Sequence, residues 1–177
     1  MYTVVIADDE EELRGAIVRK VDWQAVGFKV VGEAENGIEA LELVEKLEPD
    51  LLITDIKMPF ISGIDLARRV REIRPSMHIA FLSGYDDFKY AQQAIQYNII
   101  SYLLKPISLE ELTKEMGVIK EKIDKKFMEF GAKGQGVSSL RANEPEIAEL
   151  LMSLLMDDSS DVKYSGNVKE SVQSEID

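Results

Sequence analysis

Charged and hydroxyl side chains follow short apolar runs at four places in the sequence. Asp8 and Asp9 follow TVVIA, and Asp55 follows LLIT. Ser83 follows IAFL, and Lys105 follows SYLL. Taken singly, an aspartate after a strand is common turn chemistry, and a lone lysine is a solvated charge. Taken together, three carboxylates, one hydroxyl and one ammonium would bind a cation and an anionic group side by side.

Clustered carboxylates repel one another and call for a cation. Oxygen ligands with no histidine or cysteine nearby suit Mg²⁺, which usually binds one or two carboxylates together with phosphate oxygens. A carboxylate beside such an ion can act as a nucleophile and form an acyl phosphate. The hydroxyl and the ammonium would then hold the phosphoryl oxygens. These residue types therefore indicate phosphoryl chemistry, although each aspartate alone is also acceptable as a turn or capping residue.

Alternating strand-like and helix-like segments would bring these side chains together. Apolar runs predict strands at residues 3–7, from about 28, at 51–54, 78–82 and 101–104. Apolar residues at three- and four-residue steps predict helices at 11–21, 37–47, 62–73, about 88–95 and from about 108. This alternation predicts an α/β fold with a doubly wound parallel sheet. Such sheets bind ligands at the carboxyl ends of their strands, where the polar residues lie.

The composition narrows the class of protein. The net charge of −12 predicts repulsion from nucleic-acid backbones, so any action on DNA would need a module beyond this chain. The absence of cysteine excludes disulfides and thiolate metal sites. No apolar run approaches the roughly 20 residues that span a membrane, and the first residues do not resemble a signal peptide. We therefore expect a cytoplasmic protein with no membrane contact.

The segments VVIADDE, LLITDIKMP, GIDLARRVR, AFLSGY and SYLLKPI together resemble the receiver domain of bacterial response regulators, over about residues 1–125. VDWQAVGFKVVGEAENGIEALEL and LSGYDDFKYAQQAI are similar to receivers of the YesN/AraC-type subfamily. The resemblance implies a flavodoxin-like (βα)5 sheet with strand order 2-1-3-4-5. It also implies a two-component signalling protein, which a partner sensor histidine kinase phosphorylates and which controls transcription through a DNA-binding module. Such a domain is not an enzyme, beyond catalysing its own phosphorylation and dephosphorylation.

The resemblance assigns the acidic residues their roles. It implies that Asp55 is the phosphoacceptor. It implies that Asp8 and Asp9 form an acidic Mg²⁺ pocket. In that pocket Asp9, Asp55 and the backbone carbonyl of Lys57 would be the direct ligands.

The remaining strand-end residues resemble the switch of the same family. By this resemblance Lys105 pairs with the phosphoryl group and is joined to Pro106 by a cis peptide bond. Ser83 would be the switch hydroxyl and Tyr102 the switch aromatic. We expect Ser83 to move toward the phosphoryl group and Tyr102 to move inward after it.

Two other functions fit part of the pattern. A magnesium-dependent aspartyl phosphatase of the haloacid-dehalogenase type would carry a second aspartate where this sequence has Lys57. A flavodoxin-like flavin-binding module would carry a hydroxyl- and glycine-rich loop after the first strand, where the acids Asp8 to Glu12 would repel a flavin phosphate. The only histidine, His78, begins the fourth predicted strand, away from the acidic ends. The phosphodonor histidine is therefore expected on another protein.

Residues 126–177 are expected to form a helical and linker extension that is partly disordered. Apolar residues from Leu109 to Phe127 recur like a short coiled-coil seam, the linker GAKGQGVSS follows, and a second apolar stripe covers residues 147–155. These stripes would either pack onto the receiver or pair between chains. We expect a monomer or weak dimer, with the homodimer favoured by phosphorylation. The extension contains no recognisable helix-turn-helix.

Overall fold

The computed structural model describes residues 1–84 and 95–132, and its five strands form one parallel sheet in the order β2-β1-β3-β4-β5. The strands are β1 (Tyr2–Ala7), β2 (Phe28–Ala34), β3 (Leu51–Asp55), β4 (His78–Ser83) and β5 (Ser101–Leu104). The helices are α1 (Glu11–Lys20), α2 (Gly37–Leu47), α3 (Gly63–Ile73) and α5 (Leu109–Ala132). The predicted fold class and strand order are confirmed.

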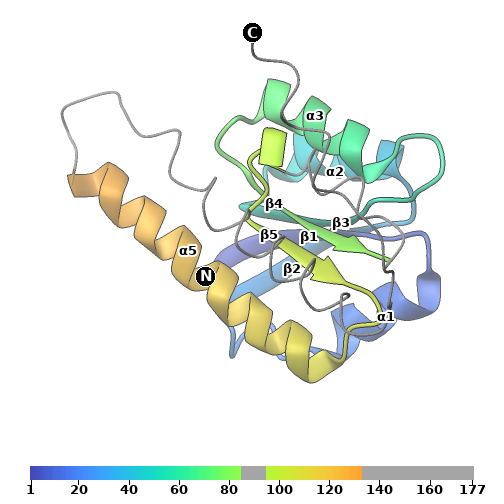
Figure 1. Cartoon of the computed structure of the whole chain (residues 1–177), viewed down its shortest axis with the longest axis horizontal. Helices are drawn as coiled ribbons and strands as arrows, with labels where there is room; N and C mark the ends of the chain where they lie inside the picture. The colour runs from blue at the N-terminus through green and yellow to red at the C-terminus, as the bar shows by residue number, and fades with distance from the viewer. Residues whose placement is uncertain (85–94, 133–177) are drawn as a thin grey trace, which may run out of the picture.

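Helices cover both faces of the sheet, with α2 and α3 on one side and α1 and α5 on the other (Figure 1). Leu52 of β3 belongs to the apolar core beneath α2 and α3, and Ile53 belongs to the core beneath α1 and α5. Successive residues of a strand thus enter opposite cores. This two-sided burial explains why the strands read as continuous apolar runs rather than alternating ones.

The strand register brings the polar strand ends to the same level. Asp55 pairs with Leu82, so it lies beside the end of β4 at Ser83. Ser83 in turn pairs with Leu104, the residue before Lys105. Residues far apart in the sequence therefore meet at one edge of the sheet.

The connection from β3 to α3 is tight because Gly63 has no side chain. A Cβ atom at Gly63 would overlap the carbonyl oxygen of Asp55. The Gly63 N–H group donates a hydrogen bond of 2.8 Å to the carbonyl of Ile56, and Ser62 caps α3 by accepting from the N–H group of Asp65. This close approach fixes the backbone at the end of β3, which carries Asp55.

The long helix α5 packs most of its apolar seam against the sheet. Leu112, Met116, Ile119 and Ile123 are at most 3% exposed and belong to the core that contains β1 and β3. At these positions the seam therefore has the first of its two expected uses, packing onto the receiver, because the sheet covers it. Phe127, by contrast, is 74% exposed, and the C-terminal part of α5 extends beyond the sheet (Figure 1).

Several predicted segments lie outside the described residues. They are most of the helix predicted at 88–95, the apolar stripe at 147–155 and all of the linker after Ala132. The first two residues of that linker, Gly131 and Ala132, belong to α5. The predicted boundary between the receiver domain and its extension, after residue 125, falls inside α5. This boundary therefore stays a prediction. None of the helices in the described ranges is long and apolar enough to cross a membrane.

A half-buried arginine joins α3 to the segments that lead into β4 and β5. Arg71 donates hydrogen bonds to the carbonyl groups of Tyr97 at 2.7 Å, Asn98 at 3.0 Å, Pro75 at 3.3 Å, and Met77. Burial lowers the pKa of its guanidinium to about 10. All four of these acceptors are main-chain carbonyls, at the amino ends of the strands and thus opposite the acidic edge.

Candidate functional site

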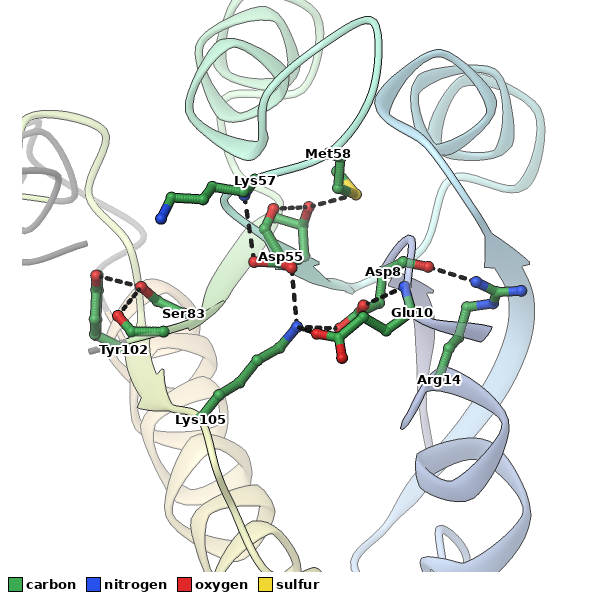
Figure 2. Close-up of polar contacts among 11 residues, drawn as sticks. Asp8, Glu10, Arg14, Asp55, Lys57, Met58, Ser83, Tyr102 and Lys105 are labelled. Carbon is green, nitrogen blue, oxygen red and sulfur yellow. Dashed lines mark hydrogen bonds and ion pairs between the residues drawn. The ribbon is translucent and has the colours of Figure 1, made fainter. Parts of the chain in front are cut away.

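The predicted site residues converge at the carboxyl ends of β1, β3, β4 and β5 (Figure 2). Asp8 and Ser83 are fully buried, and Asp55 is 6% exposed. Only one other polar residue in the described part of the chain, Thr54, is buried to this extent. Burying carboxylates costs free energy unless they are paired, so their concentration here points to a functional site.

Three carboxylates form the acidic part of the site. One oxygen from each of Asp8, Asp9 and Asp55 lies within 4.8 Å of the others, and Asp9 is the exposed member. Burial raises the pKa of the Asp8 carboxyl above its ordinary value, although Lys105 opposes this shift. The cluster offers only hard oxygen ligands, with neither histidine nor cysteine among them. This acidic pocket is typical of sites that bind Mg²⁺.

The ammonium of Lys105 points toward the carboxylates of Asp8, Glu10 and Asp55 (Figure 2). Its Nζ is 2.9 Å from Asp8 Oδ2, 2.8 Å from Glu10 Oε1 and 2.9 Å from Asp55 Oδ2. Burial by itself lowers the pKa of the Lys105 ammonium, but its hydrogen bonds to Glu10, Asp55 and Asp8 outweigh this and raise the pKa above its ordinary value. The expected cis peptide bond between Lys105 and Pro106 is present.

Two residues of this environment were not identified from the sequence. Glu10 forms an ion pair with Lys105. The only feature of the sequence that could have indicated this role is the position of Glu10 directly after Asp8 and Asp9. Arg14 donates a hydrogen bond to the carbonyl of Asp8, and its Nε lies 3.7 Å from Glu33. Arg14 and the N–H group of Glu10, which donates to Asp8 Oδ1 at 2.9 Å, fix the turn after β1.

The loop after β3 holds the other side of Asp55. The N–H group of Lys57 donates to Asp55 Oδ1 at 3.3 Å, so both oxygens of this carboxylate have a partner. An open cleft of about 440 Å³ adjoins this loop and is lined by Asp9, Lys57 and Met58 among others. The cleft is thus lined by the exposed member of the acidic cluster and by the residues that directly follow Asp55.

Ser83 and Tyr102 are joined by a hydrogen bond. The Tyr102 hydroxyl donates to Ser83 Oγ at 2.8 Å, and the Ser83 hydroxyl donates to the carbonyl of Gly84 at 3.1 Å. The Tyr102 residue is 8% exposed, and its ring meets Phe81 edge-on at a centroid distance of 6.3 Å. The movement of Ser83 and Tyr102 that we expect on phosphorylation stays a prediction. The ring is already inside, because Ser83 gives the buried hydroxyl a partner.

His78 lies at the amino end of β4, at the edge opposite the acidic residues. Burial, together with the charges of Lys126 and Arg71, lowers the pKa of its imidazole to about 4, and the charge of Asp50 opposes this shift. The histidine is thus remote from Asp55, as the sequence predicted, and it favours the neutral form.

Comparison with known proteins gives a consistent result. The family model described as "Response regulator receiver domain" matches residues 4–116. The chain is 37% identical over 123 residues to the transcriptional regulatory protein YesN of Bacillus subtilis, covering 66% of this chain and 33% of YesN. It is also 37% identical over 117 residues to the transcriptional regulatory protein HptR of Staphylococcus aureus, covering 66% of this chain and 46% of HptR.

A solved structure extends the likeness to the fold. The REC domain of AraT, a response regulator from Geobacillus stearothermophilus, is 40% identical and superposes with a TM-score of 0.67. The match covers 71% of this chain and 97% of the AraT chain. The chain spans only a third to about half of the length of the curated relatives named above. The similarity therefore concerns their receiver part.

Proposed function

The chain belongs to the response-regulator receiver family, and from this we propose that it accepts a phosphoryl group on Asp55 and thereby switches conformation in two-component signalling. The observation that carries the proposal is the position of Asp55. Its carboxylate is nearly buried, lies within 2.9 Å of the Lys105 ammonium and shares one acidic cluster with Asp8 and Asp9. Both a cation and an anionic phosphoryl group would find opposite charges there.

The residues of the site would have different roles in this reaction. A carboxylate oxygen of Asp55 would attack the phosphorus atom of a phosphohistidine, so that the O–P bond forms while the N–P bond breaks. Lys105 would neutralise charge on the phosphoryl oxygens. The Ser83 hydroxyl would turn from the carbonyl of Gly84 to a phosphoryl oxygen, and it could keep accepting from Tyr102 as it does so.

The acidic cluster fits Mg²⁺ because three carboxylate oxygens converge and no soft ligand is present among them. Asp9, Asp55 and the backbone carbonyl of Lys57 would hold the ion directly, and Asp8 would add its buried negative charge. When bound, the ion would neutralise the carboxylates and the incoming phosphoryl group.

The chain is a receiver domain rather than a classical enzyme, and the chemistry proposed for it is its own phosphorylation and dephosphorylation. Receiver domains of response regulators generally interact with histidine kinases, and the distant, neutral His78 supports a phosphodonor on such a partner. This partnership would place the chain in the cytoplasm. The relatives' names support an output in transcription, which would need a DNA-binding module outside these residues.

We also propose that phosphorylation favours a homodimer. Support comes from Phe127 and Met128, which are 74% and 72% exposed at the end of α5 that extends beyond the sheet. Sedimentation with and without beryllofluoride, a phosphoryl mimic, tests this. A monomer in both states at high protein concentration would exclude a phosphorylation-driven dimer of this chain.

Intact-mass measurement after incubation with Mg²⁺ and acetyl phosphate tests the phosphoacceptor. The wild-type chain should gain the mass of one phosphoryl group, and Asp55→Asn should gain none. Asp22→Asn is the matched control, because Asp22 is exposed and its carboxylate serves only a turn, accepting from the N–H group of Ala25. Equal labelling of Asp55→Asn and the control would contradict the assignment.

A further inference from the structure

The ammonium of Lys105 is surrounded by as many carboxylates as it has N–H donors. Hydrogen bonds reach Glu10 and Asp55, and the carboxylate of Asp8 completes an ion pair at 2.9 Å. An ammonium offers three N–H groups and no more. An incoming phosphoryl oxygen therefore has to compete with these carboxylates for the ammonium of Lys105.

The three carboxylates differ in their freedom to withdraw. The side chain of Asp8 is fully buried, and that of Asp55 is 8% exposed. The side chain of Glu10 is 62% exposed. Glu10 is also the N-cap residue of α1, yet its side chain makes no capping hydrogen bond. Glu10 can thus swing into water at little cost, whereas Asp8 would have to leave the protein interior.

The charge of Glu10 also opposes the incoming group. Its carboxylate and the phosphoryl group are both anionic, and both would bind the same ammonium. Opposite charges attract and like charges repel most strongly where water is partly excluded, as it is around the 13% exposed Lys105 side chain. Occupation of Lys105 by Glu10 and by a phosphoryl oxygen is therefore competitive.

We propose that Glu10 is a positioning residue that retains Lys105 in the unphosphorylated protein and releases it when Asp55 is phosphorylated. This inference rests on the proposed function of Asp55 and concerns the regulation of the same site. Glu10 thereby slows phosphorylation and weakens binding of phosphoryl mimics. It acts through Lys105 and takes no part in the bonds that form or break.

The test compares Glu10→Gln with Glu11→Gln at saturating Mg²⁺. Both variants remove one negative charge from the start of α1, but Glu11 is exposed and does not contact Lys105. The rate of labelling by acetyl phosphate is followed by intact mass, and the affinity for beryllofluoride by fluorine NMR. Glu10→Gln should raise both about two- to fivefold, the range for an ion pair with one exposed partner. Glu11→Gln should change neither.

Salt dependence separates this role from a structural one. Because added salt screens exposed charges, the advantage of Glu10→Gln over wild type should shrink as ionic strength rises. A structural defect would not depend on salt in this way.

Each result of the test bears either on the role of Glu10 or on the phosphorylation of Asp55. Labelling of wild type and both variants at equal rates, equal acceleration by Glu10→Gln and Glu11→Gln, or slower labelling of Glu10→Gln would each overturn the role of Glu10. All of these results would leave phosphorylation of Asp55 intact. Absence of label on Asp55 in every protein would instead remove the proposed function.

Discussion

Acidification from about pH 7 to about pH 5 is expected to destabilise the chain through its single histidine. Burial, with the charges of Lys126 and Arg71, lowers the pKa of His78 to about 4 in the folded protein. In the unfolded chain the pKa returns to about 6.5. A depressed folded pKa gives stability that is present above the unfolded pKa and is lost as the pH falls toward the folded one.

The size of the effect follows from the two pKa values. Between pH 7 and pH 5 the unfolded chain gains about 0.7 proton at this site, whereas the folded chain gains almost none. Full linkage would then cost about 2 kcal/mol of the free energy of unfolding. His78 is only partly buried, so solvent screening reduces the expected loss to about 1 kcal/mol.

Urea unfolding followed by the fluorescence of Trp23 measures this loss. Trp23 is the only tryptophan and is 7% exposed, so unfolding changes its surroundings. His78→Gln is the comparison, because it keeps the main-chain hydrogen bond of 3.0 Å from residue 78 to the carbonyl of Asp50. The variant should lose about 1 kcal/mol less than wild type over the same pH interval.

NMR titration of the lone imidazole provides an independent check. Its midpoint should lie near 4, well below the ordinary value. A midpoint near 6.5, together with equal acid sensitivity of wild type and His78→Gln, would refute the reasoning.

Four further changes have expected outcomes. Gly63→Ala should destabilise the chain by about 1–3 kcal/mol because its methyl group overlaps the carbonyl of Asp55. Gly117→Ala, with nothing within 4 Å of the added methyl group, should stabilise α5 by up to about 1 kcal/mol; thermal unfolding measures both, and shifts of the same sign would contradict this contrast. Tyr102→Phe keeps the ring but removes the donor to Ser83, so urea unfolding should show a loss of about 1 kcal/mol, and no measurable loss would count against the bond. Chelation of Mg²⁺ by EDTA should stop labelling by acetyl phosphate and added Mg²⁺ should restore it, whereas labelling in excess chelator would argue against a metal requirement.

The convergence of the strand ends could be predicted because it follows from topology. Asp55 and Lys105 are 50 residues apart, yet the carboxyl ends of parallel strands share one edge of a sheet. The sequence also contained the signals for strand and helix limits, such as Ser62 before α3. These features depend on burial periodicity and caps, which are local properties of the chain.

The partners of individual side chains could not be predicted in the same way. Glu10 and Glu11 are alike in the sequence, and only the geometry of the first turn decides which one reaches Lys105. Met116 and Ile119 recur at a helical spacing that suits a sheet or a second helix equally well. A periodic stripe indicates that a face is buried, but the covering surface is a property of the whole fold.

The contacts of Arg71 have a consequence for mutational tolerance. Every one of its four acceptors is a main-chain carbonyl, and a side-chain substitution does not remove a main-chain carbonyl. In a saturation library, substitutions at positions 75, 77, 97 and 98 should therefore leave the acceptors of this link in place, while burial of Met77 and the φ of 52° at Asn98 restrict those two positions for other reasons. Only position 71 needs a particular side chain for this link. Even lysine would not replace arginine there, because it lacks the planar array of donors that reaches both segments at once. The link between the segments that precede β4 and β5 thus depends on the identity of a single residue, Arg71.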